Sequence, residues 1–398
     1  MTAKQKEYLP VLLLSLVFVV LIFLLHHKWC FSMLSQTDDI WNKRLDIRMT
    51  SYPFSTRYFT NYATLYIHRL TSLSILNSFQ VVQFTLLFLL GPALYRFLKS
   101  IRFSQASALL GLVVFYWSYP IASAFVQPVF TWDEFWTYLF VLLSFTYMFQ
   151  GNLLIAVLLF IPTLYSRETA VFYYPILLAG GWRYCRNTRN IFKAIYLLLP
   201  LLAYLPFYII IHGTHHSGMA KDPFLVFSYN FESFLRGSDS IFSFLVSFGF
   251  LWVAAPVGAW RETFEKNNPF KRFLTHAMLY LAPVTIALVF CRGFARETRM
   301  FFPPIVVILP LALFYLRGVS QDIRAISTRF RTILLFISFL LLIWLGIESA
   351  NWLFPKFDYR GCAKAARLWL GVHFGLILCM AELSLIRKMR TYRASRSR

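Results

Sequence analysis

Charged residues are scarce in this sequence, and acidic residues are the scarcest among them. Only 14% of the 398 residues are charged and 17 are Asp or Glu, whereas 58% are hydrophobic and 19% are aromatic. Ordinary globular proteins are roughly a quarter charged. The composition therefore excludes a soluble globular protein and indicates a membrane protein.

Cysteine motifs are missing as well. The five cysteines, Cys30, Cys185, Cys291, Cys362 and Cys379, form no CxxC pair and lack the spacing of a metal site. The net charge is +22, but the basic residues are dispersed between apolar runs, where they orient helices against anionic lipids. Membrane lipids are therefore expected partners, and nucleic acid is not.

Apolar runs of about 20 residues, the length that crosses a bilayer as a helix, recur from end to end. They predict an all-α, polytopic transmembrane bundle of about twelve membrane segments in one integral membrane domain, residues 1–398. The runs cover 8–25, 73–95, 105–126, 134–149, 153–166, 170–182, 191–211, 241–260, 273–291, 300–316, 331–348 and 368–386. No small-residue cleavage site follows the first run, so it is expected to be a retained helix.

Basic residues also predict the orientation. Lys and Arg gather in the segments 96–102, 183–193, 317–331 and 387–398. Because such residues favour the cytoplasmic side, both termini are expected inside. The long polar stretches then become outer loops, at 26–72, 212–240 and 349–367. This pattern is typical of a multi-pass protein of the bacterial inner membrane with its active face outside the cytoplasm.

The runs 153–166 and 170–182 are each too short to cross a hydrocarbon core of about 30 Å at about 1.5 Å per residue. They predict a helical hairpin with Arg167 and Glu168 at its tip. A charged tip at membrane depth needs partners or a water-filled cavity. The alternative is one long tilted helix with an internal Arg–Glu pair.

Two adjacent carboxylates mark the first outer loop. Asp38 and Asp39 lie in the polar stretch 35–57 and are followed by a basic cluster that ends at Arg57. Carboxylates beside cations suit a reaction in which a hydroxyl is deprotonated while a phosphate leaves. Both carboxylates can contact one group only if the backbone turns there. The alternative is a solvated loop with internal ion pairs.

Three further charged clusters are expected at the outer face. They are Asp133 and Glu134 at the start of the fourth run, Arg167 and Glu168 at the hairpin tip, and Arg296, Glu297 and Arg299 before the tenth run. Arginine grips phosphate with two parallel hydrogen bonds and stays charged in a low-dielectric site. The arginines are therefore candidate ligands of a lipid phosphate, oriented by the neighbouring Glu residues. The alternative is that each Glu only neutralises an Arg.

A histidine cluster raises the question of a metal. His212 and His216 have the i, i+4 spacing that can chelate a metal on a helix. Gly213 and Gly218 argue against a regular helix, and no Glu accompanies the pair as in H-E-x-x-H. No metal site is assigned, and a divalent metal stays an open alternative as a cofactor.

The order of these features resembles the GT-C superfamily of integral-membrane glycosyltransferases, which use polyprenyl-phosphate-linked sugars. The similar features are Asp38 and Asp39 after the first helix, Asp133 and Glu134 near the start of the fourth, and the outward arginines Arg167 and Arg296. The resemblance implies transfer of a sugar to a glycan, lipid or protein acceptor. It also implies that Asp38 or Asp39 is the catalytic base, with Asp133 and Glu134 as the next candidates, and that basic residues bind the lipid phosphate.

Two other functions share some of these features. A transporter or flippase for a lipid-linked or anionic solute places its site in interrupted hydrophobic runs such as the one at Arg167. A lipid-linked polymerase or ligase would also use outer-face arginines. The charges gather on one face, whereas a transporter needs access from both sides, so the sequence favours an enzyme.

Overall fold

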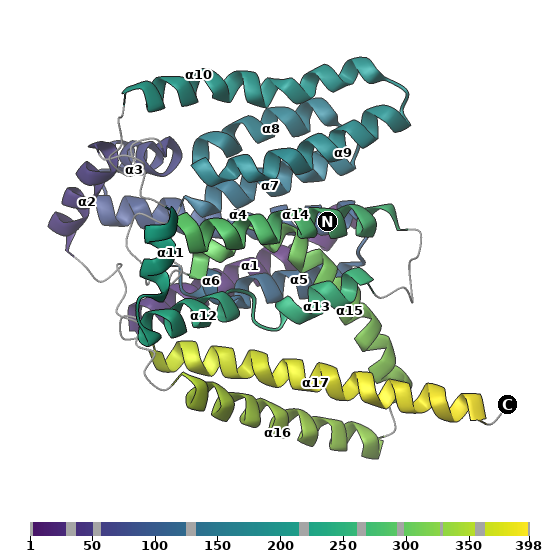
Figure 1. The fold of residues 1–398 in the computed structure, drawn as a ribbon. Coiled ribbons are helices and arrows are strands. Elements are labelled where there is room, and N and C mark those ends of the chain that lie inside the picture. The colour runs from purple at the N-terminus through teal and green to yellow at the C-terminus, as the bar shows by residue number, and fades with distance from the viewer. Residues whose placement is uncertain are drawn as a thin grey trace. The chain divides into compact units, whose positions relative to one another are not determined.

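A computed structural model describes residues 3–28, 37–50, 57–124, 133–214, 223–260, 268–292, 298–326, 329–354 and 363–396. Figure 1 shows the helices, and within these ranges the chain forms no strand. The prediction of an all-α protein is confirmed. The chain divides into two compact units: unit 1 comprises residues 1–117 and 121–221, and unit 2 comprises residues 118–120 and 222–398. One integral domain over residues 1–398 stays a prediction.

Unit 1 is built around a long central helix. Its elements are α1 (Ala3–Lys28), α2 (Asp38–Thr50), α3 (Tyr58–Thr71), α4 (Ile75–Ser100), α5 (Gln105–Trp117), α7 (Glu134–Phe149), α8 (Leu153–Ser166), η4 (Glu168–Tyr173), α9 (Tyr174–Asn187), η5 (Ile191–Leu198) and α10 (Leu199–Thr214). The short α6 (Tyr119–Ala122) lies where the chain passes between units. Helix α4 is central because it packs against α1, α3, α5 and α7.

Side-chain pairs set the direction of the helices around α4. Phe23 of α1 contacts Phe84, and Glu7 accepts a hydrogen bond from the Tyr95 hydroxyl, so α1 runs antiparallel to α4. At the far end of α4, Phe97 contacts Phe149, the last residue of α7. Since α3 and α4 are joined by a short turn, the starts of α4 and α7 and the end of α3 lie at the same end of unit 1.

Helices α8 and α9 form the predicted hairpin. Helix α8 ends at Ser166, and Arg167 has extended backbone angles of φ −164° and ψ 144°. Phe160 then lies against Tyr174, and Leu153 lies near Gly181, so the two helices run antiparallel. The alternative of one continuous helix through Arg167 is wrong, because the chain reverses direction there. The depth of the hairpin in a membrane stays a prediction.

The predicted first outer loop, 26–72, has more regular structure than its polarity indicates. Residues 38–50 and 58–71 form α2 and α3. Helix α2 has Asp38 and Asp39 in its first turn and Arg48 in its last, an arrangement that the helix dipole favours. Trp41 and Arg48, two turns apart, are its buried residues. Residues 38–50 of this predicted outer loop are therefore helical, and the position of the loop outside the membrane stays a prediction.

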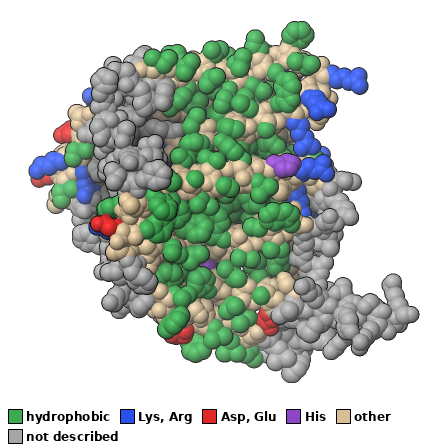
Figure 2. All heavy atoms as spheres, in the orientation of Figure 1, with side chains coloured by type: hydrophobic (Ala, Val, Ile, Leu, Met, Phe, Trp, Pro, Cys, Tyr) green, Lys and Arg blue, Asp and Glu red, His purple; other side chains and the backbone are tan. Residues whose placement is uncertain are grey.

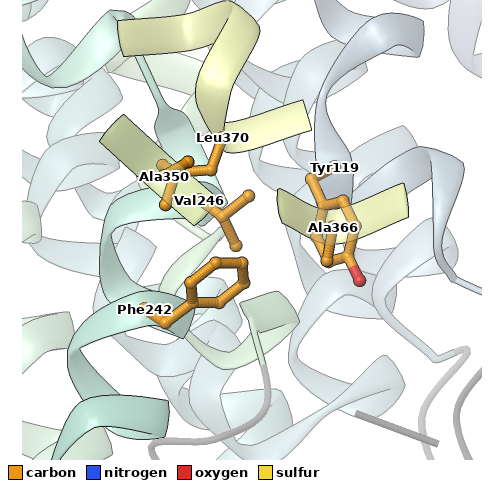
Figure 3. Close-up of a cluster of buried hydrophobic side chains, with 6 residues drawn as sticks. All are labelled: Tyr119, Phe242, Val246, Ala350, Ala366 and Leu370. Atoms are coloured by element: carbon orange, nitrogen blue, oxygen red, sulfur yellow. The ribbon is translucent and has the colours of Figure 1, made fainter. Parts of the chain in front are cut away.

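Unit 2 contains α11 (Pro223–Phe231), α12 (Phe234–Phe248), α13 (Leu251–Trp260), α14 (Pro269–Arg292), η6 (Thr298–Phe301), α15 (Ile305–Ile326), α16 (Arg329–Leu353) and α17 (Ala363–Arg396). Helices α12 and α13 form a pair bent by 55°. Figure 3 shows one core cluster of this unit, formed by Tyr119, Phe242, Val246, Ala350, Ala366 and Leu370. It joins α12 to the α16–α17 pair.

Glycines bring α16 and α17 together. A Cβ atom added to Gly375 would lie 2.4 Å from the Cα atom of Ile343, and one added to Gly371 would lie 2.4 Å from the Cα atom of Ile347. The two glycines form a G-x-x-x-G motif, the spacing that lets membrane helices approach closely. Here the motif joins two helices of one chain.

Gly375→Ala is therefore expected to destabilise unit 2. The added methyl group meets backbone atoms that cannot move cheaply, and overpacking of this kind costs about 1–3 kcal/mol. The measurement is the thermal unfolding midpoint in detergent. Gly237→Ala is the matched control, because its Cβ would lie 3.4 Å from the nearest atom, on the Phe231 ring, and a helical Gly→Ala change is favourable. Equal midpoints for both variants would contradict the close packing.

Several helices of the described part suit a bilayer. Four are long and apolar enough to cross it, at Gln5–His26, Ile75–Ser100, Pro269–Cys291 and Ala366–Ser384, and the bent α12–α13 pair makes a fifth if it counts as one span. Shorter apolar helices accompany them. Hydrophobic side chains cover much of the face shown in Figure 2. The multi-pass character is supported, whereas the number of about twelve segments goes beyond these helices and stays a prediction.

Candidate functional site

Charged side chains from separate segments of unit 1 meet in its interior. The Arg48 guanidinium, in the last turn of α2, donates two hydrogen bonds from Nη2 to the Asp133 carboxylate, at 2.7 and 2.9 Å. Arg57, just before α3, donates from Nη1 to the same carboxylate at 3.3 Å. The Arg48 and Asp133 side chains are each only 1% exposed. This ion pair is therefore shielded from water by the protein.

Asn61 fixes the orientation of the Arg48 side chain. Its Oδ1 atom accepts a hydrogen bond of 2.6 Å from Arg48 Nε. Asn61 is itself buried on α3, beside the buried Thr60 and Thr64. Because Nε and Nη2 are both held, the plane of the guanidinium is fixed before any ligand arrives.

Glu134, the residue after Asp133, forms a second buried ion pair. Arg167 Nη1 donates to Glu134 Oε1, and both side chains are almost fully buried. The hydroxyls of Thr137 and Ser166 are 2.7 Å apart and join α7 to α8 beside this pair. Asp133 and Glu134 thus bind arginines from different segments of the chain.

Local structure explains why these residues lie where they do. Asp133 is the N-cap residue of α7 and Glu134 is in its first turn, where the helix dipole stabilises negative charge. Arg48 is at the C-terminal end of α2, where the dipole stabilises positive charge. Arg167 follows α8 in extended conformation, at the reversal into η4. We name Arg48, Arg57, Asp133, Glu134 and Arg167 the arginine–carboxylate cluster.

The electrostatics of Asp133 are dominated by two opposing effects. Burial raises the pKa of the Asp133 carboxyl, but the charges of Arg48 and Arg57 outweigh this and hold the pKa below its ordinary value. Asp133 is therefore ionised at neutral pH. A carboxylate that binds two guanidinium groups and has a lowered pKa is a weak base, so its position suits electrostatic positioning better than proton abstraction.

Asp38 and Asp39 lie outside this cluster. Both are exposed in the first turn of α2, and neither forms an ion pair with another described side chain. They differ in direction, because each helical residue advances by about 100°. Asp38 lies on the side of Trp41, one turn later, whereas Asp39 lies opposite Arg48, about two and a half turns later. Of the two, Asp38 points nearer to the buried side of α2.

Several predicted site residues lie wholly or partly outside the described part of the structure. Arg296 and Glu297 lie outside the described residues, and so do His215 and His216. Glu168 and Arg299 belong to η4 and η6, but their side chains are outside the described part, as is the His212 side chain. The described side chains contain no group of three or more His, Cys, Asp or Glu that suits a metal. A shared grip on phosphate by Arg167 and Arg296 stays a prediction.

Asn61 is a functional candidate that the sequence did not indicate, and Arg48 was expected only as one cation of the basic cluster that ends at Arg57. A signal for Arg48 exists, because it follows Trp41 by seven residues and so shares one helical face with a large apolar side chain. The signal for Asn61 is the row of Thr60, Asn61 and Thr64 in an aromatic helix. Neither pattern identifies Asp133 as the partner.

Gln83 is a further buried polar residue of unit 1. It is fully buried in α4, and no described residue gives a hydrogen-bond partner to either end of its amide. Gln83 precedes Leu90 and Phe97 by about two and four turns and so shares the face of α4 that contacts α7. An unsatisfied buried amide lowers stability.

Gln83→Met is expected to raise the thermal unfolding midpoint, because methionine fills a similar volume without an unpaired polar group, which costs about 1–3 kcal/mol. Ser144→Ala is the matched control. The buried Ser144 hydroxyl donates to the Ala156 carbonyl at 2.7 Å, so its removal should lower the midpoint. A lower midpoint for Gln83→Met would show that the amide is paired in the folded protein.

The chain matches no protein-family model, no curated protein and no solved structure. The geometry of the arginine–carboxylate cluster is therefore the basis of the functional conclusion.

Proposed function

We propose that this protein is a membrane glycosyltransferase that moves a sugar from a polyprenyl-phosphate donor to an acceptor. The observation that carries the proposal is the arginine–carboxylate cluster, in which three guanidinium groups accompany two carboxylates. The excess positive charge lies in a buried, low-dielectric setting, where attraction to an anion is strong. Arginine is also the side chain best suited to hold phosphate there. The cluster therefore favours a ligand with an anionic phosphate.

The charge distribution of unit 1 supports an active face outside the cytoplasm. The cluster lies at the start of α7, whereas Arg102, Arg186 and Arg189 lie near the ends of α4 and α9, at the opposite end of unit 1. Lys and Arg favour the cytoplasmic side. The proposed arrangement is a GT-C-like bundle of about twelve membrane segments in a bacterial inner membrane, with the cluster toward the outer side.

Arg48, Arg57 and Asp38 would each have a different role in the reaction. Arg48 holds Asp133 with two short hydrogen bonds and fixes the framework. The bond from Arg57 to Asp133 is longer, at 3.3 Å, and the Arg57 side chain is 9% exposed, so Arg57 is the cation that can turn toward a phosphate at least cost. Asp38, exposed and nearer the buried side of α2, is the proposed base that activates the acceptor hydroxyl.

Arg57→Ala is expected to weaken binding of polyprenyl phosphate by roughly 10- to 100-fold, the cost of losing a charged hydrogen bond. Arg57→Lys should restore only part of the affinity, because a point charge lacks the planar fork. Affinity can be measured by native mass spectrometry of the protein in detergent. Arg69→Ala, which removes an exposed cation at the other end of α3, is the control. Unchanged affinity for Arg57→Ala at normal protein level would leave only a structural role for the cluster.

A transporter or flippase is the second candidate, and the α12–α13 pair favours it. The pair is bent by 55°, and Gly249 at the break has a φ of +50°. Transporters place their sites at broken helices. The two functions differ in product: a glycosyltransferase converts the sugar-loaded lipid into polyprenyl phosphate, whereas a flippase leaves it chemically unchanged. Comparison of lipid extracts from a deletion strain and its parent distinguishes them.

A further inference from the structure

A cationic surface lies at the end of unit 1 opposite the arginine–carboxylate cluster. Phe97 near the end of α4 contacts Phe149 at the end of α7. Gly151, in the turn that follows α7, lies beside Tyr184 near the end of α9. The ends of α4 and α9 therefore lie at the same end of unit 1. We name five of the cations at this end the basic surface: Arg102, Arg183, Arg186, Arg189 and Lys193. Figure 2 shows Lys and Arg side chains gathered at the right-hand edge of the face in view.

Two of these arginines stand at positions that normally favour glycine. Helix α4 ends with a hydrogen bond from the Phe103 N–H to the Leu98 carbonyl, and Arg102 between them has a φ of +71°. Helix α9 ends in the same way, with Arg189 at a φ of +53°. This left-handed position at a helix C-terminus is usually glycine.

The neighbouring turn of the same unit follows the usual rule. After α7 the N–H of Asn152 donates to the carbonyl of Tyr147, and the left-handed residue is Gly151, with a φ of +84°. Three turns at one end of unit 1 thus have the same geometry, and two of them carry arginine in place of glycine. Backbone strain that is kept in a structure points to a use for the side chain.

Exposed apolar side chains follow the basic surface directly. Ile191, Phe192 and Ile195 of η5 are 66%, 92% and 65% exposed. Cations beside exposed aliphatic and aromatic side chains are typical of segments that lie in the interface of a membrane, with the cations at the headgroups and the apolar groups in the acyl region. A soluble anionic partner would use the cations but would leave Phe192 in water.

We propose that the basic surface and Phe192 form a binding site for the headgroups of anionic phospholipids in the adjoining leaflet. The cations attract the phosphate groups, and their contributions add. Arg102 and Arg189 occupy strained positions because a glycine there would remove a charge from the surface. This site is independent of the proposed transferase activity, because it lies at the other end of unit 1.

The test uses the full chain in an uncharged detergent. Thermal unfolding is measured without lipid, with phosphatidylcholine and with phosphatidylglycerol, and glycerol phosphate serves as a soluble probe. Phosphatidylglycerol should raise the wild-type midpoint more than phosphatidylcholine does. In Arg102→Gly with Arg189→Gly, the midpoint without lipid should stay equal or rise, because strain is relieved. The lipid-specific rise should fall by roughly a quarter or more, since two of the eight cations at this end are lost when Lys6, Arg96 and Lys99 are counted with the basic surface.

Controls make the outcomes decisive. Lys43→Gln with Arg69→Gln removes two exposed cations from other parts of unit 1 and should keep the full lipid-specific rise. Arg183→Gln with Arg186→Gln should reduce that rise without altering a left-handed residue, and replaces the glycine variant if that fails to fold. The proposal is overturned by an equal response of the wild type to both lipids, by an equal loss in the Lys43 control, or by an equal rise with glycerol phosphate.

Discussion

Asp133→Asn is expected to destabilise the protein by about 3–5 kcal/mol, the usual cost of removing one partner from a buried ion pair. The variant keeps the shape of the side chain but leaves Arg48, 1% exposed, and the nearly buried Arg57 without their counter-charge. The measurement is the thermal unfolding midpoint in detergent. Since the pKa of Asp133 is lowered in the folded state, its contribution is present above the ordinary Asp pKa of about 3.9 and is lost as the pH falls below that value.

Two variants separate this effect from a general response to charge removal. Asp46→Asn removes an exposed carboxylate from α2 and should change stability by less than about 0.5 kcal/mol. Arg48→Met combined with Asp133→Asn should recover part of the loss, because the buried cation whose counter-charge was removed is then removed as well. An Asp133→Asn midpoint equal to that of the wild type would show that the pair is not buried in the folded protein.

Asp38→Asn is expected to reduce sugar transfer by roughly 10² to 10⁴ fold, the usual contribution of a general base. Asparagine keeps the size and hydrogen bonding of the side chain but cannot accept the proton of the acceptor hydroxyl. Binding of polyprenyl phosphate should stay near that of the wild type, because Asp38 is exposed in the first turn of α2 and lies outside the buried cluster. The measurement is the rate at which polyprenyl phosphate forms from a sugar-loaded donor in proteoliposomes.

Asp39→Asn is the matched control for this experiment. Asp39 neighbours Asp38 and is also exposed, but it lies on the side of α2 opposite Arg48. The control should therefore keep most of the activity. Equal turnover for Asp38→Asn and the wild type would show that Asp38 is not the catalytic base, and Glu134 would be the next carboxylate to test.

The hairpin at Arg167 could be predicted from the sequence because its cause is local. Two apolar runs, each shorter than a membrane crossing, are separated by charged residues. Arg167 is charged and therefore interrupts the apolar sequence between the two helices. The break after Ser166 and the antiparallel direction of α8 and α9 follow from this pattern.

The partners of the charged residues could not be predicted from the sequence. Arg48 and Asp133 are 85 positions apart, and no periodicity connects residues at that distance. The polarity of residues 38–50 indicated a loop, because most of their side chains are polar or charged. The buried face of the helix, formed by Trp41 and Arg48, is therefore not visible as an apolar pattern in the sequence. Tertiary packing, and not the local pattern, decides that an arginine of α2 is buried against the start of α7.

The most direct test of the central claim compares polyprenyl phosphate with polyprenol of the same chain length as ligands of the wild-type protein. The two lipids differ only in the phosphate, so any difference in affinity reports a phosphate site. If the arginine–carboxylate cluster binds the phosphate, polyprenyl phosphate should bind at least roughly tenfold more tightly, a difference of about 1.4 kcal/mol. Arg57→Ala should remove most of that preference. Equal affinity for the two lipids would contradict a phosphate site and with it the proposed transferase.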